Sequence, residues 1–429
     1  MSQRYKKSEE LLERACKTVP LGSQTFSKSK TQLPFGVSPY FAKRAEGAYL
    51  YDVDGNKYID FVNSLCSITL GYQDADVTRA VKNQLEDGII FSLAHELEFL
   101  VAEKICEMVP CAEMVRFGKN GSDATSGAIR IARAHTGKDH VLVCGYHGWQ
   151  DWYIGSTARN LGVPEATRSL THTFLYNDIN SLSKLFEEYK NNVAAVILEP
   201  VNVVAPKDNF LQKVKELAHK NNAVLVFDET ITGFRYANGG AQEFFGVTPD
   251  LATFGKGLAN GYPVSALAGK AELMKLMEEI FFSFTFGGET LSLAASLATL
   301  TKLQKEPVVE TLKARGTDLM ERLQSLIDRH DLGHIFNIAG YPFWSFFITK
   351  DFEKYSMWDF KTFFIQEMFA NGIYSIGTHN ISYAHTKENI DSLMIAYDSY
   401  FSKVNDGLKS GNLMSYLKCE TLKPLFKVR

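Results

Sequence analysis

The sequence lacks the features of a membrane or nucleic-acid-binding protein. None of its apolar runs reaches the roughly 18 residues that a transmembrane helix requires. The start of the chain, from Met1 to Glu10, contains no apolar core of a signal peptide. A net charge of -3 gives no reason to expect nucleic acid or an anionic membrane as a partner. We therefore predict a cytoplasmic protein that binds neither.

Cysteine and histidine motifs are also missing. Six cysteines are scattered without a C-x-x-C pair, and ten histidines occur without an H-E-x-x-H or similar spacing. This pattern is typical of reduced, mostly buried thiols and not of a disulfide framework or a zinc site, so we predict no bound metal. No G-x-G-x-x-G follows a strand-like run, which argues against a dinucleotide-binding oxidoreductase.

The central part of the chain alternates between helix and strand patterns. The continuous apolar runs Val193–Leu198 and Ala223–Phe227 are typical of strands buried on both faces of a parallel sheet. Helical periods are expected at Glu96–Met108, Ser122–His135 and Ser292–Lys305, and further strands at Glu113–Phe117 and His140–Cys144. The alternation predicts an α/β fold: a large domain with a mostly parallel sheet and helices on both faces.

The two ends of the chain are expected to form a smaller α+β domain together. Asp54-Gly55 lies between two strand-like runs and predicts a hairpin. An amphipathic helix is expected over residues 1–20, helices at Glu310–Arg329, 358–371 and 387–404, and a strand at Pro342–Ile348. We place the domains at residues 1–75, 76–310 and 311–429. The tail from residue 405 onward is either a docking arm or frayed.

Two segments carry residues that indicate a particular chemistry. The run Val224–Arg235 predicts a buried strand that ends by presenting the carboxylate of Asp228. Lys256 lies between two glycines after another short apolar strand. A buried carboxylate and a lysine in a glycine-lined pocket are what pyridoxal phosphate (PLP) requires, since the Asp keeps the pyridine nitrogen protonated and the Lys holds the aldehyde and moves protons. The alternatives are a surface lysine and a capping Asp.

Both segments resemble class III aminotransferases of PLP fold type I, and within that family they are similar to glutamate-1-semialdehyde 2,1-aminomutases. The stretch F-D-E-T-I-T-G-F-R ending at Arg235 is close to the family's D-E-V-M-T-G-F-R. The resemblance covers about residues 35–400. It implies that Asp228 is the partner of the pyridine nitrogen, that Ile231 packs on one ring face, and that Lys256 forms the Schiff base.

Two further motifs resemble cofactor-binding elements of the family. Gly121, Ser122 and Asp123 open a predicted helix and resemble the S-G-T-E-A phosphate loop, where the free N–H groups of a helix start attract an anion. Tyr146 begins a Y-H-G motif, whose aromatic ring stacks on the cofactor in that family. The resemblance therefore implies that the first three residues lie at the phosphate and Tyr146 at the ring.

Glu199 and Asn202 follow a buried strand within a motif that resembles the family's E-P-V. For Glu199 two roles stay open, contact with the cofactor or support of its loop, and Asn202 is expected near the ring hydroxyl. The segment Ser283–Ser292 resembles the family's G-T-L-S-G-N-P, with Thr285 at the threonine that reaches the phosphate of the neighbouring subunit's cofactor. That resemblance implies a homodimer with shared active sites.

The substrate-facing elements depart from the aminomutase pattern. Where the aminomutase loop S-P-V-R carries a carboxylate-binding arginine, this chain offers only Lys28 and Lys30, which lack a planar fork. Trp149 and Trp152 lie in what looks like an insertion after Y-H-G, and an aromatic-lined loop there suits a polyhydroxylated substrate.

We therefore predict a PLP-dependent aminotransferase that moves an amine from an amino acid donor, glutamate, to a carbonyl acceptor. The preferred acceptor is a keto-sugar or sugar phosphate of a surface-polysaccharide pathway. The alternative is glutamate-1-semialdehyde 2,1-aminomutase, which moves an amine within one molecule. A binding protein of the same fold without turnover has no use for both Lys256 and Asp228.

Overall fold

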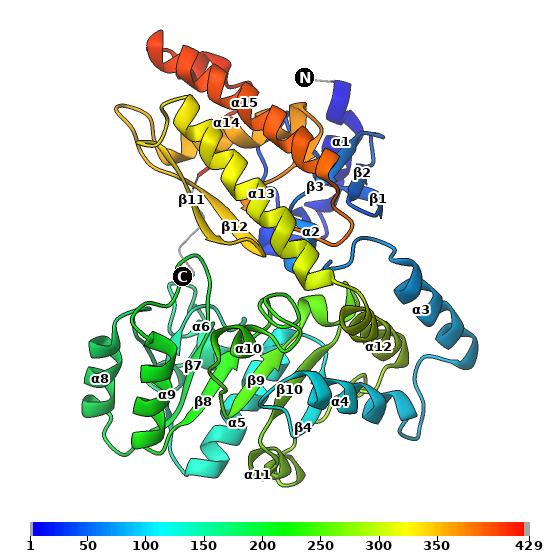
Figure 1. Ribbon diagram of the computed structural model, residues 1–429, viewed down its shortest axis with the longest axis vertical. Helices are drawn as coiled ribbons and strands as arrows, with labels where there is room; N and C mark the ends of the chain where they lie inside the picture. Colours follow the sequence, from blue (N-terminus) through cyan, green and yellow to red (C-terminus); the bar gives the residue numbers. More distant parts are fainter. Residues whose placement is uncertain (1–2, 424–429) are drawn as a thin grey trace. The chain divides into compact units, whose positions relative to one another are not determined.

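The computed structural model describes residues 3–423 and divides into two compact units (Figure 1). Residues 3–65, 69–74 and 310–423 form the first, here called the terminal unit. Residues 66–68 and 75–309 form the second, the central unit. Each unit is described by itself below.

A seven-stranded sheet organises the central unit. Its strands, in spatial order, are β4 (Met114–Gly118), β10 (Ser265–Gly269), β9 (Leu251–Phe254), β8 (Val224–Asp228), β7 (Val193–Leu198), β5 (His140–Cys144) and β6 (Thr171–Thr173). The five strands from β9 to β6 are parallel. β10 pairs antiparallel with both β4 and β9, so β4 runs in the same direction as those five. The prediction of a mostly parallel sheet is therefore confirmed.

Helices cover both faces of this sheet (Figure 1). On one face, α5 (Gly121–Thr136), α6 (Asp151–Ile154) and α11 (Ala271–Met274) share an apolar core with the strands. On the other face, α8 (Ile179–Glu188) and α9 (Phe210–Lys220) do so. Because the strands are sandwiched, every residue of β7 and β8 is buried, which explains their unbroken apolar sequences.

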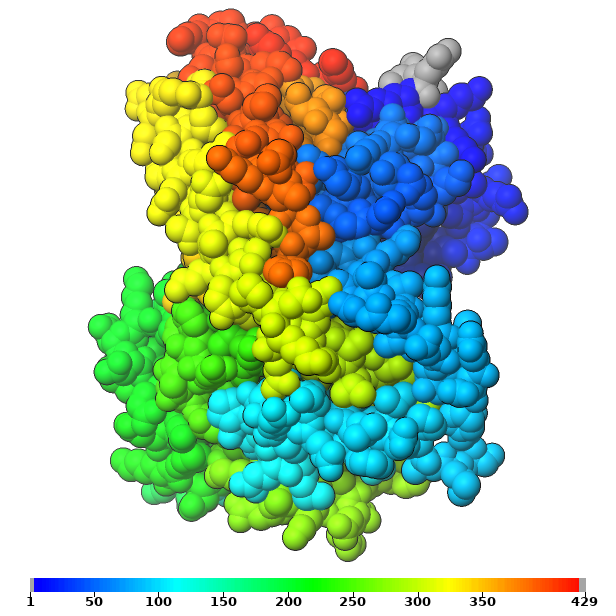
Figure 2. Space-filling model, turned by 45° about the vertical axis from the view of Figure 1, so that its right-hand side comes forward, coloured from blue at the N-terminus to red at the C-terminus, as the bar shows by residue number. Residues whose placement is uncertain are grey.

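The remaining helices of the central unit are peripheral to the sheet. They are α3 (Ala75–Asp87), α4 (Glu96–Met108), α7 (Glu165–Arg168), α10 (Ala241–Phe245) and α12 (Thr290–Lys305), with the short 3-10 helices η4 (Lys256–Ala259) and η5 (Lys275–Glu278). Figure 2 shows the segment of α3 and α4, light blue to cyan, on the surface beside the yellow-green α12, against which both pack.

The parallel strands determine where polar side chains gather. The carboxyl ends of β5, β7, β8 and β9 lie at the same edge of the sheet, and the loops that follow them begin at Gly145, Glu199, Glu229 and Gly255. In open α/β sheets this edge is where ligands bind. The chain thus brings together four segments that are far apart in the sequence.

The terminal unit contains two small sheets. The first has the order β1 (Ala42–Glu46), β2 (Tyr49–Asp52), β3 (Lys57–Asp60), β13 (Ile373–Tyr374), and the second β11 (Phe336–Tyr341), β12 (Trp344–Thr349), β14 (Thr378–His379). The helices are α1 (Lys6–Ala15), α2 (Asn63–Cys66), α13 (Val308–Arg329), α14 (Met357–Ala370) and α15 (Lys387–Lys409), with η1 (Gln3–Tyr5), η2 (Pro20–Gly22), η3 (Phe26–Lys28) and η6 (Leu413–Tyr416). The predicted hairpin is present, with Asp54 and Gly55 in the turn between β2 and β3.

The structure shortens the predicted first helix and decides between the two alternatives for the C-terminal tail. The first helix ends at Ala15, and the stretch to Pro20 is turn. The described part of the tail docks on α14 and is not frayed. The Gln366 side chain of α14 donates to the Tyr416 carbonyl and accepts from the Lys418 N–H. Thr421 Oγ1 donates to Asp359 Oδ1. The last six residues, 424–429, lie outside the described residues.

Two absences concern the described chain as a whole. Among the helices of residues 3–423, none combines the length and apolarity that crossing a membrane would need. That same part of the chain holds no cluster of three or more His, Cys, Asp or Glu side chains suited to a metal ion.

His379 is buried in the terminal unit and is hydrogen-bonded to Ser345 Oγ at 3.0 Å and to the Tyr397 hydroxyl at 2.8 Å. Burial lowers its pKa to about 3. Between about pH 6.5 and pH 3 the unfolded chain therefore binds a proton at this ring that the folded chain does not. The folded state should lose up to roughly 1.4 kcal/mol per pH unit as the pH falls through this range.

We expect His379→Gln to weaken this acid sensitivity. The measurement is urea unfolding of both proteins at pH 7 and pH 5. The loss of unfolding free energy between the two pH values should be smaller in the variant, by about 2 kcal/mol at most. An equal loss in both proteins would show that His379 does not titrate on unfolding.

Candidate active site

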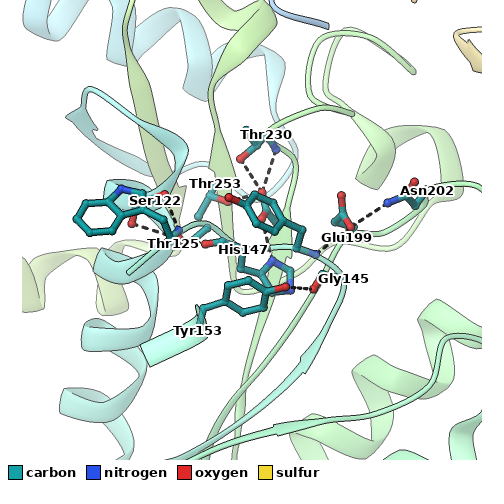
Figure 3. Close-up of polar contacts among 12 residues, drawn as sticks. Ser122, Thr125, Gly145, His147, Tyr153, Glu199, Asn202, Thr230 and Thr253 are labelled. Atoms are coloured by element: carbon teal, nitrogen blue, oxygen red, sulfur yellow. Dashed lines mark hydrogen bonds and ion pairs between the residues drawn. The ribbon is translucent and has the colours of Figure 1, made fainter. Parts of the chain in front are cut away.

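Asp228 is the last residue of β8 and lies almost fully buried at the edge of the sheet. Its Oδ2 is 2.8 Å from His147 Nδ1. Its Oδ1 accepts hydrogen bonds from Thr230 Oγ1 at 2.6 Å, the Thr230 N–H at 3.1 Å and Thr253 Oγ1 at 3.1 Å (Figure 3). No described helix begins in the turn after Asp228, so the alternative of a helix cap does not apply.

These hydrogen bonds decide the charge of Asp228. Burial alone would raise the pKa of its carboxyl, but the hydrogen bonds from His147 and Thr230 outweigh this effect and hold the pKa below its usual range. The group is therefore an ionised carboxylate at neutral pH, although almost no water reaches it. Because a carboxylate only accepts, His147 must carry its proton on Nδ1.

His147 is a functional residue to which the sequence reasoning gave no role. It follows Tyr146 in the Y-H-G motif, which was interpreted only through its aromatic ring. The side chain is buried, and its Nε2 has no hydrogen-bond partner within the described chain. The available signal was a polar residue directly after a buried strand, at the same sheet edge as Asp228. Thr230 and Thr253, which also hold the carboxylate, were missed in the same way.

Lys256 begins η4, directly after β9, and its backbone has a positive φ of 42°. Such a left-handed conformation costs a residue other than glycine roughly 1–2 kcal/mol and persists where the surroundings impose it, often at functional sites. A Cβ at the preceding Gly255 would lie 3.3 Å from Thr230 Cγ2 and 4.0 Å from Gly121 Cα. The lysine loop therefore runs close to both the Asp228 turn and the start of α5.

The start of α5 offers an anion site. The helix begins at Gly121 and is 16 residues long, so its first N–H groups carry the positive end of a substantial helix dipole. A Cβ at Gly121 would lie 3.1 Å from Thr230 Cγ2, so only glycine packs there without displacement. Ser122 Oγ accepts a hydrogen bond from the Trp149 N–H at 3.3 Å.

Asp123 has a different task at this helix start. Its Oδ2 accepts hydrogen bonds from the backbone N–H groups of Asn120 at 2.7 Å and Lys119 at 3.0 Å, which completes a capping box. A carboxylate would also repel a phosphate. The role of Asp123 in the site is therefore to hold the first turn of α5, which presents Gly121 and Ser122.

Glu199 supports the loop that carries Tyr146. Its Oε2 accepts hydrogen bonds from the Tyr146 N–H at 3.1 Å and from Asn202 Nδ2 at 3.0 Å (Figure 3). The Tyr153 hydroxyl donates to the Gly145 carbonyl at 2.7 Å and braces the same loop. About a third of Tyr146 stays exposed.

Two predicted site residues stand apart from this hydrogen-bonded group. Ile231 is half-buried in the turn after Asp228. Thr285 is exposed, in the loop that leads to α12. That loop is anchored near the start of α5, because Glu289 caps α12 and pairs with Lys119 Nζ at 2.9 Å. The structure thus groups Asp228, Tyr146, Glu199 and Asn202, with the Lys256 loop and the α5 start beside them.

Comparisons with known proteins show the family and the fold of this chain. A family model described as Aminotransferase class-III matches residues 33–394. The 3-aminobutyryl-CoA aminotransferase of Cloacimonas acidaminovorans is 34% identical over 394 residues, which cover 90% of this chain and 94% of that protein. The glutamate-1-semialdehyde 2,1-aminomutase of Alkaliphilus oremlandii is 41% identical over 340 residues, or 75% and 80% of the two chains. The PLP internal aldimine form of FumI from Sphingopyxis sp. MTA144 has a TM-score of 0.88 at 30% identity, over 94% of this chain and 98% of that one.

Proposed function

Because this chain belongs to the class III aminotransferase family, we propose that it is a PLP-dependent aminotransferase that takes an amine from glutamate and passes it to a separate carbonyl acceptor. The observation that carries the proposal is the buried, ionised Asp228 at the same sheet edge as the Lys256 loop and the start of α5. The six free cysteines agree with a reducing compartment, and we place the enzyme in the cytoplasm.

The residues present fit PLP. Asp228 offers an anionic partner for a protonated ring nitrogen, and the α5 start offers N–H groups for a phosphate. Tyr146 has an exposed ring for stacking. Lys256 supplies the amine. When bound, PLP supplies a ring that accepts electrons from the carbon bearing the amine.

The protein's own groups supply orientation and proton transfer. His147 and Thr230 fix the Asp228 carboxylate, which would keep the ring nitrogen of a bound PLP protonated. Lys256 Nζ, in its unprotonated form, would take the proton from the amine-bearing carbon of the donor, and in the second half-reaction it would deliver a proton to the acceptor.

The acceptor predicted from the sequence, a keto-sugar or sugar phosphate, loses part of its basis. Trp152 is buried in the core of the central unit, where its Nε1 donates to Ser126 Oγ at 2.9 Å. Only Trp149, which is 68% exposed, can face a substrate. The loop is therefore not an aromatic-lined surface.

Glutamate-1-semialdehyde 2,1-aminomutase is the second candidate, since a relative of that name is 41% identical. Against it, the loop expected to bind the far carboxylate carries a lysine, Lys28, whose Nζ donates to Ser64 Oγ at 3.4 Å. A lysine lacks the two-pronged geometry of an arginine.

The experiment that separates the two candidates compares half-reactions with an isomerisation. Glutamate should bleach the aldehyde form of the holoenzyme, and a carbonyl compound should restore its absorbance. Turnover of glutamate-1-semialdehyde alone, without any amino donor and at a rate typical of a committed enzyme, would establish the aminomutase and refute our proposal.

We further propose a homodimer in which each copy completes the other's active site. Large apolar side chains are exposed in two neighbouring segments of the central unit: Ile89, Ile90, Phe91 and Leu93 in one, and Phe281, Phe284 and Phe286 in the other. The segments are joined where the Thr290 N–H donates to the Ile89 carbonyl at 2.9 Å. An apolar patch of this kind is typical of a protein–protein interface.

Thr285 lies within this patch and is expected to donate a hydrogen bond to the cofactor phosphate of the other copy. Such a charge-assisted bond contributes roughly 1.5–3 kcal/mol, so Thr285→Ala should weaken PLP affinity about 10- to 150-fold. Dilution to monomer should release PLP as well. A monomer that retains PLP with undiminished affinity would refute the shared site.

His147 is expected to act by positioning Asp228. His147→Phe removes the hydrogen bond that lowers the carboxyl's pKa, so the acid limb of the pH profile of kcat/KM should move to higher pH. His147→Asn, whose amide can donate in place of Nδ1, should restore much of the wild-type profile. An unchanged profile in the Phe variant would confine His147 to a packing role.

A further inference from the structure

A cavity lies beside the cofactor-binding residues of the central unit. It has a volume of about 460 Å³ and lies beyond the carboxyl ends of β5, β6 and β7. Gly145, Glu199 and Asn202 belong to its wall as well as to the candidate active site. Asp228 and Lys256 are not part of the wall that the described chain forms. The cavity therefore adjoins the active site without being the place of the cofactor ring.

Most of the wall is apolar, and hydrogen bonds tie its loops together. It is formed largely by Tyr153, Phe174, Leu175, Tyr176, Val203 and Val204. The loops after β6 and β7 are tied together, since the Tyr176 hydroxyl donates to the Pro200 carbonyl at 2.6 Å and Asn177 Nδ2 to the Ala205 carbonyl at 2.8 Å. Leu175 and Val204 are 64% and 50% exposed, so the cavity is open to solvent on one side.

One polar atom in the wall is unsatisfied. Asn202 Nδ2 donates to Glu199 Oε2, but its Oδ1 is buried without a hydrogen-bond partner in the described chain. A buried acceptor without a donor is unfavourable. The hydroxyls of Tyr153, Ser156 and Thr157 already donate to backbone carbonyls. The cavity thus matches a ligand that is apolar except for a single N–H or O–H donor.

We propose that this cavity binds the non-reacting part of the carbonyl acceptor and of the amine formed from it, and that this part is an aryl or alkyl group with one hydrogen-bond donor near the reacting carbon. The proposal rests on the aminotransferase function proposed above. An apolar cavity of about 150 Å³ holds benzene, so 460 Å³ accommodates a phenyl ring with a chain of several carbons. A polyhydroxylated sugar would lose hydrogen bonds to water against these walls.

The amine formed from the acceptor reacts with the aldehyde form of the holoenzyme in the reverse direction. The test measures this half-reaction with α- and β-amino acids that carry methyl, propyl, pentyl or phenyl side chains. Loss of the aldehyde form's absorbance gives kcat/KM for each. Every buried CH₂ should raise kcat/KM about fourfold, equivalent to about 0.8 kcal/mol. Val203→Phe should remove this gain and leave the methyl compounds unaffected. Val204→Phe is a second variant and should have the same effect. Val53→Phe, the same exchange at a half-exposed position in the terminal unit, is the control and should change nothing.

A non-reacting probe, 4-phenylbutanamide, provides a measurement independent of turnover. It should bind the holoenzyme in calorimetry, and Val203→Phe should weaken it at least tenfold while Val53→Phe leaves it unchanged. If glutamate does not change the absorbance either, the aminotransferase proposal fails; if glutamate reacts and none of these amino acids does, the cavity proposal is refuted. If amino acids react but chain length has no effect, if Val203→Phe slows short and long compounds equally, or if the probe does not bind, the function stands and the cavity proposal is refuted.

Discussion

Asp228→Asn is expected to retain PLP but to lose activity on the order of 10³-fold, which corresponds to about 4 kcal/mol of additional barrier. An amide has nearly the same shape as the carboxylate and can still accept hydrogen bonds from Thr230 and Thr253. It carries no charge, however, so it does not stabilise a proton on the ring nitrogen. The electrons released at the amine-bearing carbon then lose their acceptor.

The prediction requires cofactor content and turnover to be measured on the same preparation. PLP should remain bound, since the α5 start and Lys256 are intact. Glu229→Gln is an instructive neighbour: Glu229 is fully buried, accepts from Thr232 Oγ1 at 2.6 Å and from two backbone N–H groups at the start of α10, and faces away from the site. It should affect stability more than chemistry. Turnover near the wild-type level in Asp228→Asn would remove Asp228 from the mechanism.

Elements with strong periodicity could be predicted from the sequence. β5 and β7 have the predicted bounds, and so does α4, because buried strands and amphipathic helices have distinct apolar patterns. β6 and β11 were missed. β6 has only three residues, and β11 buries only its first side chain fully and contains an Asn and a Gly, so neither shows an apolar run. The docked tail depends on individual polar contacts with α14, which no local pattern encodes.

Some residues of the candidate site could likewise be predicted from the sequence, and others could not. Lys256 and Asp228 could be predicted because their flanking residues are distinctive: glycines beside the one and a buried strand before the other. The capping role of Asp123 and the burial of Trp152 were not predicted, since both depend on what the side chain meets in three dimensions. His147 shows the same limit, because its contact with Asp228 joins two residues that are 81 positions apart in the sequence.

Lys256→Ala is expected to abolish turnover almost completely. It removes the only group here assigned to proton transfer, a loss that costs on the order of 10²–10⁴-fold on its own, together with the covalent link to PLP. The substitution leaves the hydrogen bonds around Asp228 and the start of α5 unchanged. The variant should therefore still bind PLP, but without the covalent link.

Borohydride reduction followed by peptide mapping tests this assignment directly. In the wild type the cofactor should be fixed to the peptide that contains Lys256, and in Lys256→Ala no lysine should be labelled. Lys270→Ala is a suitable control, since that lysine lies in the central unit but forms an ion pair with Asp250 at 2.6 Å. The Lys270→Ala variant should be labelled at Lys256 and should turn over at the wild-type rate. Added methylamine should restore part of the activity of Lys256→Ala by moving the proton in place of Nζ. A label on any other lysine in the wild type, or turnover in Lys256→Ala without added amine, would refute the central assignment.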